Sequence, residues 1–132
     1  MKSEEYNGQI IKLMPLSSCL KFASVSDAIA FCSMMLKDFN SPNNDRVSFN
    51  VGAHICEEQL DRESNEFSYG DGLGFAARLL AESQKTDTNS IFISSSVYEI
   101  IKTIPLKITC EFVKDWYLKH NDLTIKIYRV IL

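Results

Sequence analysis

Hydrophobic and polar residues follow two different rhythms along the chain, and these rhythms predict an order of strands and helices. The predicted strands cover residues 9–14, 18–22, 47–56, 90–93, 108–112 and 123–130. The predicted helices cover residues 24–39, 71–84 and 95–102. Two strands, alternating helices and strands, and a final antiparallel hairpin indicate an α+β domain with its helices mainly on one face of the sheet.

The helix predicted over residues 24–39 has a defined start. Ser24 is a favoured N-cap residue, and Asp27 three residues later completes a capping-box pattern. Apolar residues then recur at helical spacing and predict a buried stripe of Ala28, Ile29, Cys32, Met35, Leu36 and Phe39. In the helix over residues 71–84, we expect the core face to consist of Leu73, Ala76, Ala77 and Leu80. The acidic stretch over residues 57–66 predicts an exposed loop or hairpin between these helices.

The composition fits one globular domain. The chain has 132 residues, of which 45% are hydrophobic and 23% are charged, so residues 1–132 hold enough apolar material for a single core. A formal net charge of −3 and the lack of a basic run argue against nucleic acid and against a membrane surface as partners. The longest apolar run is also far too short to span a bilayer.

Four cysteines are widely spaced along the chain, at Cys19, Cys32, Cys56 and Cys110. No C-x-x-C pair and no neighbouring pair of histidines accompanies them, so the sequence does not indicate a zinc site. Four buried thiols in a reducing compartment are the simplest interpretation, and we expect a cytoplasmic protein. His54 lies in an apolar stretch and is expected to be a hydrogen-bonded core histidine.

A glycine-rich turn leads into a helix that bears one arginine. Residues 69–80 read YGDGLGFAARLL, and an apolar strand reading IFIS begins at Ile91. This arrangement resembles the catalytic domain of class III adenylyl and guanylyl cyclases, where a G-x-x-V-N-x-A-A-R-L run precedes an I-x-x-S strand. Shorter matches follow the family's order at residues 8–16, 24–36, 50–57, 94–98 and 118–120. The resemblance implies a ferredoxin-like, nucleotide-cyclase-like sheet.

The resemblance also implies a metal site, because cyclases hold Mg²⁺ or Mn²⁺ between two aspartates. One aspartate lies on an opening strand that precedes the hairpin, and the residues before Gly8 do not contain that strand. The other falls at Leu16, which offers no oxygen ligand. We therefore expect a truncated, degenerate cyclase domain without a metal or other cofactor. The strand near Leu20 should then pair directly, in parallel, with the strand from Val47, unless another chain supplies the missing strand.

Most of the other cyclase groups are replaced. The base-reading lysine falls at Ile10, its polar partner at Phe67, and the asparagine that orients the ribose at Gly74. Arg78 is retained at the position of the arginine that stabilises the phosphate in the transition state, and its alternative role is a surface or interface salt bridge. Gly70 opens a turn whose backbone N–H groups could face an anion. Arg78 is thus the candidate catalytic residue, and the candidate nucleotide-binding residues are Phe67, Gly70 and Gly74.

These replacements favour a non-catalytic cyclase-homology domain that acts through protein association. Because cyclase domains pair head-to-tail, the resemblance implies a homodimer, or a heterodimer with another cyclase-type domain. One alternative is a complementary subunit that supplies Arg78 to a mixed active site for cyclic nucleotide synthesis. Another is a sensor that binds a nucleotide without converting it, with Phe67 and Gly74 opening an apolar base pocket.

Overall fold

The computed structural model of the protein describes residues 2–13, 17–39, 49–86, 89–105, 107–118 and 123–131. The helices among these residues are α1 (Lys2–Glu5), α2 (Val25–Phe39), α3 (Gly72–Gln84) and α4 (Ser95–Ile101). The strands are β1 (Gly8–Leu13), β2 (Ser18–Phe22), β3 (Asn50–Ala53), β4 (Gln59–Asp61), β5 (Glu66–Ser68), β6 (Ser90–Ser94), β7 (Thr109–Leu118) and β8 (Leu123–Ile131). None of these helices is both long and apolar enough to cross a membrane.

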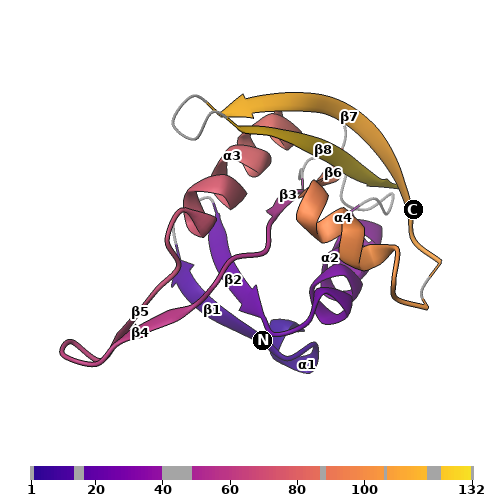
Figure 1. Ribbon diagram of the computed structural model, residues 1–132. Coiled ribbons are helices and arrows are strands. Elements are labelled where there is room, and N and C mark those ends of the chain that lie inside the picture. The colour runs from indigo at the N-terminus through magenta and orange to yellow at the C-terminus, as the bar shows by residue number, and fades with distance from the viewer. Residues whose placement is uncertain are drawn as a thin grey trace.

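A four-stranded sheet in the order β3-β6-β8-β7 forms the centre of the molecule (Figure 1). Strand β3 runs parallel to β6, while β8 pairs antiparallel with both β6 and β7. Two further hairpins, β1–β2 and β4–β5, form sheets of their own. In Figure 1 the β4–β5 hairpin projects from the lower left of the molecule, far from the β7–β8 ribbon at the top.

The buried strand β6 divides the core into two layers, because successive side chains of a strand point to opposite faces. Ile91 and Ile93 belong to the larger hydrophobic cluster. The other members of that cluster from α2 and α4 are Ile29, Phe31, Cys32, Leu36, Val97 and Ile101. Phe92 faces the other way and packs with Leu79 of α3 and Ile127 of β8. Helices α2 and α4 thus cover one face and α3 the other, and the predicted α+β class is confirmed.

Several predicted elements match the structure closely, and others differ in extent. The Ser24 hydroxyl accepts a hydrogen bond from the backbone N–H of Asp27 at 3.3 Å, as expected for the N-cap of α2. The acidic stretch does form an exposed hairpin, β4–β5. Helix α1 was not predicted, and β7 is a ten-residue strand that continues to Leu118 rather than ending near Phe112.

The strand predicted over residues 47–56 was too long at its C-terminal end. Strand β3 ends at Ala53, whereas residues 47 and 48 lie outside the described part of the chain. After β3 the chain leaves the central sheet, and the Glu58 carboxylate pairs with the ammonium group of Lys21 on β2 at 2.9 Å. This contact draws the segment toward the β1–β2 hairpin.

The strand near Leu20 was predicted to pair in parallel with the strand that starts at Val47. For the described residues this prediction is wrong. Strands β2 and β3 belong to separate sheets, and β2 pairs only with β1 among the described strands. Side chains of both strands nevertheless pack on the α2 cluster, including Leu20 and Val51. The alternative, that another chain supplies the missing opening strand, stays a prediction.

The predicted core face of α3 is also wrong. Leu73 and Ala77 are exposed, while Ala76 and Leu80 are half-buried. The buried residues of the helix are Gly72, Leu79 and Ser83. Small residues occur on several sides of this helix, so its apolar pattern does not fix the buried side. Contact with β3 and β6 selects the side that carries Leu79.

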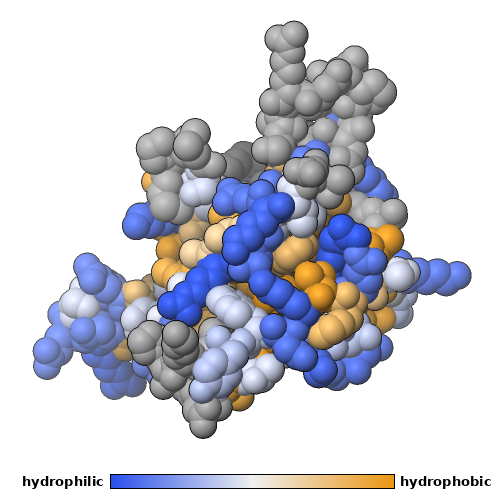
Figure 2. All heavy atoms as spheres, turned by 90° about the horizontal axis from the view of Figure 1, so that it is seen from above, coloured by the Kyte–Doolittle hydropathy of each residue, from blue (hydrophilic) through white to orange (hydrophobic). Residues whose placement is uncertain are grey.

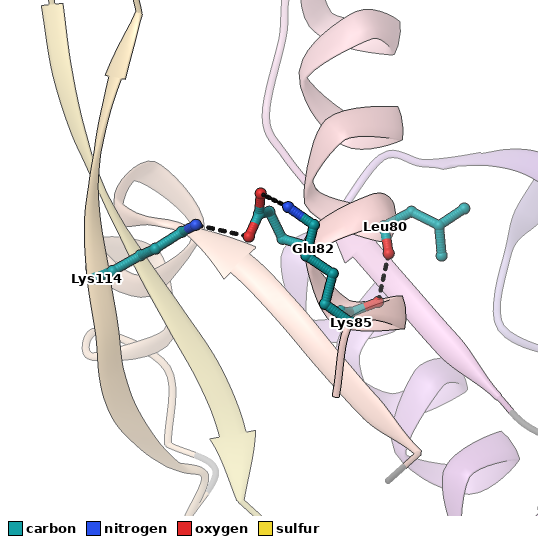
Figure 3. Close-up of polar contacts among 5 residues, drawn as sticks. Leu80, Glu82, Lys85 and Lys114 are labelled. Carbon is teal, nitrogen blue, oxygen red and sulfur yellow. Dashed lines mark hydrogen bonds and ion pairs between the residues drawn. The ribbon is translucent and has the colours of Figure 1, made fainter. Parts of the chain in front are cut away.

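Polar contacts fasten the C-terminal half of α3 to the sheet. The Glu82 carboxylate accepts hydrogen bonds from Lys114 of β7 at 2.6 Å and from Lys85 at 3.0 Å (Figure 3). On the β3 side, the Asn50 amide donates to the backbone carbonyl of Ser83 at 3.1 Å and to the Ser90 hydroxyl at 3.2 Å. The Asn50 bonds satisfy polar groups that burial would otherwise leave unpaired.

Candidate functional site

An open cavity of about 780 Å³ lies where the β4–β5 hairpin, the segment after β3, strand β1 and the N-terminus of α3 meet. Its lining is mainly apolar and aromatic, with Ile11, Ile55, Phe67, Tyr69, Leu73 and Phe75 among its residues. Cavities of this size and lining commonly bind small molecules or segments of other proteins. This cavity is therefore the candidate functional site.

His54 forms part of the inner wall of the cavity. Its Nδ1 atom lies 2.8 Å from the Ser94 hydroxyl, which in turn lies 2.9 Å from the Ser96 hydroxyl. The imidazole ring packs on Phe75, with ring centroids 4.8 Å apart, and Phe75 meets Trp116 edge to face. Burial lowers the pKa of His54 below its ordinary value, so the neutral imidazole is favoured. The expected hydrogen-bonded histidine is present, at a cavity wall rather than deep in the core.

Phe67 and Tyr69, which line the cavity, contact Lys21 of β2. Its ammonium nitrogen pairs with Glu58 and lies 4.8 Å from the centre of the Phe67 ring and 5.8 Å from that of Tyr69. A cation over an aromatic face is attracted by the negative potential of the ring. Lys21 thereby holds the base of the hairpin beside the cavity.

The structure separates the predicted site residues into two groups. Phe67 and Gly70 line the cavity, and Gly70 adopts a positive φ of 56° that glycine accommodates without strain. Gly74 and Arg78 lie on an exposed side of α3 and do not line it. A Cβ at Gly74 would meet nothing within 4 Å. No hydrogen bond or ion pair links Arg78 to another described residue.

Sequence reasoning missed the contributions of Cys56, Tyr69 and Phe75 to this cavity. Cys56 packs so closely on Gly72 that a Cβ at that glycine would lie 2.3 Å from the Cys56 sulfur. Nothing in the local pattern of residues 54–58 predicts this contact, because it joins the end of β3 to the start of α3. The expectation of four buried thiols is wrong, since Cys56 is exposed and only Cys32 is fully buried.

The two-metal site that the resemblance implies can be compared with the described residues. Leu16, at the position of one metal-binding aspartate, has no ligand atom, and its placement lies outside the described residues. Over the part of the chain that the structure describes, no three or more His, Cys, Asp or Glu side chains are grouped to hold a metal ion.

Two solved structures resemble this fold over nearly the whole chain. The adenylate/guanylate cyclase/hydrolase from Silicibacter pomeroyi superposes with a TM-score of 0.75 at 19% sequence identity, covering 98% of this chain and 75% of that chain. The adenylyl cyclase CyaB from P. aeruginosa gives a TM-score of 0.64 at 19% identity, covering 98% of this chain and 74% of that chain. The domain thus has a nucleotide-cyclase-like fold. No protein-family model and no curated protein matches the sequence.

Proposed function

We propose that this domain is a non-catalytic relative of the nucleotide cyclases that acts by pairing with another cyclase-type domain, in the first instance a second copy of itself. The observation that carries the proposal is an exposed apolar surface around the cavity. It consists of Ile55, Phe67 and Leu73, which line the cavity, and Leu60, which lies directly opposite Phe67 in the hairpin; we call these four residues the cavity face. Large apolar side chains gathered on one surface are typical of interaction sites.

The β4–β5 hairpin supplies the most exposed part of the cavity face. Leu60 and Phe67 sit directly opposite each other in its register, and 48% and 52% of their surfaces are exposed. Each strand has three residues, and a two-stranded hairpin by itself is only marginally stable in water. Figure 2 shows the rest of this projection, at the left, as largely hydrophilic. Burial of the Leu60–Phe67 pair against a partner would stabilise the hairpin.

The residues at the family's base-reading positions support a role without catalysis. Ile10 and Phe67 offer apolar side chains where a lysine and its polar partner would read a base, and Gly74 offers no side chain to a ribose. Such groups favour contact with protein over the hydrogen bonding that fixes a nucleotide. Purified protein with Mg²⁺ or Mn²⁺ should therefore produce no cyclic nucleotide from ATP or GTP. Turnover that is lost in Arg78→Ala would overturn the proposal.

Sedimentation of matched aspartate variants tests the association surface. Phe67→Asp should dissociate the dimer, because a charge would have to be buried at the interface. Phe112→Asp, on β7, is the control, since Phe112 is also 52% exposed but lies outside the cavity face. Both variants should keep the wild-type circular dichroism spectrum, which shows that they fold, and Phe67→Asp should melt lower only by the stability that association contributes. A wild-type chain that remains monomeric at high concentration, or equal dissociation by both variants, would contradict the proposal.

A second candidate function is a complementary subunit that donates Arg78 to a partner cyclase. It is favoured by the exposure of Arg78 and by its lack of a polar contact with other described residues. Adding this chain to a cyclase-type partner should then raise cyclic nucleotide synthesis. Arg78→Ala and Arg78→Lys should both abolish the stimulation, because lysine lacks the planar fork of guanidinium, while folding is unchanged. Full stimulation by Arg78→Ala would reject this function.

A third candidate, nucleotide sensing, is favoured by the volume of the cavity and by the Phe67 and Tyr69 rings at its wall. An aromatic face can stack on a purine. Calorimetric titration with a panel of nucleotides should then show binding that Phe67→Ala weakens. Affinity no tighter than about 1 mM for every nucleotide would end this hypothesis.

A further inference from the structure

An ion pair joins two cysteine-bearing segments from distant parts of the chain beside the cavity. Lys21 of β2 and Glu58 of the segment after β3 pair at 2.9 Å, although 37 positions separate them. Cys19 precedes Lys21 by two residues, and Cys56 precedes Glu58 by two residues. The ion pair therefore brings the two cysteine-bearing segments next to each other.

The alternation of β2 turns Cys19 toward the segment that carries Cys56. Leu20 and Phe22 pack against the core cluster of α2, so Cys19 and Lys21 point to the opposite side of the strand. On that side, Lys21 reaches Glu58 and the aromatic rings of the hairpin base. Cys56 is exposed, and its sulfur lies against Gly72 at the start of α3.

The electrostatics of Cys19 agree with this placement, while burial and the Glu58 carboxylate raise the pKa of Cys56. Burial raises the pKa of Cys19, and the nearby charge of a Cys56 thiolate raises it further. Cys32 lies in the core, where burial raises its pKa to about 12. Cys110 is half-buried on β7, in the central sheet.

We propose that Cys19 and Cys56 form a dithiol that low-molecular-weight disulfides, such as oxidised glutathione, convert into an intramolecular disulfide. The exposed Cys56 thiolate attacks one sulfur of oxidised glutathione, which forms a mixed disulfide and releases one glutathione thiolate. The Cys19 thiolate then attacks the Cys56 sulfur and releases the second glutathione. Two protein thiols are oxidised, one small disulfide is reduced to two thiols, and the protons of the protein thiols pass to the leaving thiolates.

This disulfide would fix β2 to the segment that leads into the β4–β5 hairpin. It would therefore set the position of the cavity wall and limit the conformations of the unfolded chain. The dithiol does not depend on the proposed association, because both sulfurs come from one chain.

Thiol trapping and mass mapping test the proposal. The protein is incubated with oxidised glutathione, its remaining thiols are alkylated in denaturant so that the buried Cys32 also reacts, and its peptides are mapped without reduction. We expect a Cys19–Cys56 cross-linked peptide, alkylated Cys32 and Cys110, and a higher Tm that dithiothreitol reverses. Cys110→Ser should give the same cross-link. Cys19→Ser should instead carry glutathione on Cys56.

Three outcomes would overturn the proposal. One is alkylation of all four cysteines after the oxidant treatment. Another is glutathione on Cys56 of the wild type with Cys19 still free. The third is a cross-link that joins a different pair of cysteines. Because the readout is the covalent state of each sulfur, a failure of the proposed dimerisation would leave this test unaffected.

Discussion

Gly52 of β3 and Ala76 of α3 meet through their backbones: a Cβ built on Gly52 would lie 2.3 Å from the Ala76 carbonyl oxygen. The same Cβ would lie 2.3 Å from the backbone nitrogen of Leu80 and 2.7 Å from the Leu79 Cβ. Backbone atoms cannot move aside as a flexible side chain can. The absence of a side chain at Gly52 therefore sets the distance between the sheet and α3.

We predict that Gly52→Ala destabilises the fold by about 1 to 3 kcal/mol, because the added methyl group must push α3 away from β3. Gly74→Ala is the matched control, since nothing lies within 4 Å of a Cβ at that position. It should stabilise the protein by about 0.5 to 1 kcal/mol through the better helix propensity of alanine. Urea unfolding of both variants measures these changes. Equal effects of the two substitutions would show that α3 does not approach β3 as described.

The two neighbouring leucines of α3 should respond differently to truncation. Leu79 is 1% exposed and packs with Phe92 and Ile127, so Leu79→Ala should cost about 2 to 5 kcal/mol. Leu80 is half-buried, and Leu80→Ala should cost clearly less. Thermal melts of the two variants provide the comparison. A larger loss at Leu80 would restore the helix orientation that the sequence pattern predicts.

The ion pair between Glu82 and Lys114 predicts a pH-dependent contribution to stability. Hydrogen bonding from Lys114 lowers the pKa of Glu82 below its ordinary value of 4.5. A carboxylate with a lowered folded pKa stabilises the fold above its unfolded pKa, and this stabilisation is lost as the pH falls through the folded pKa.

Lys114→Met should therefore lower the free energy of unfolding at pH 7 by up to about 1 kcal/mol, because Lys114 is partly exposed to solvent. The difference from the wild type should shrink as the pH falls below 4.5. Lys126→Met is the control, since the Lys126–Asp115 pair is longer, at 3.5 Å, and both side chains are 58% exposed. A loss in Lys114→Met that stays constant down to acidic pH would indicate lost packing rather than lost charge.

His54 should make the fold less stable in mild acid. Burial lowers its folded pKa below the ordinary value of 6.5, so the unfolded chain binds the proton more readily. Stability should therefore fall as the pH drops from 6.5 to the folded pKa and change little from this group below it. His54→Gln should remove this part of the pH dependence. NMR titration of the His54 ring checks the pKa directly, and a value above 6.5 would contradict the prediction.

Local sequence patterns were enough to predict the order of the main elements and the α+β class. Ser24 and the apolar spacing that follows it place α2, and the run of apolar residues from Ile91 places β6. The glycine-rich turn and Arg78 pointed to the cyclase-like fold that the solved structures share. These features are local, because caps, turns and periodic patterns depend on residues only a few positions apart.

The buried side of α3, the end of β3 and the lining of the cavity depend on packing between elements that are far apart in the sequence. Small residues lie on several sides of α3, so the spacing of apolar residues does not identify its buried side. The close contact of α3 with Gly52 of β3 is what places Leu79 in the core. The Lys21–Glu58 pair and the approach of Cys56 to Gly72 join segments far apart in sequence. No local propensity encodes such contacts, because they form only once packing has brought the separate elements together.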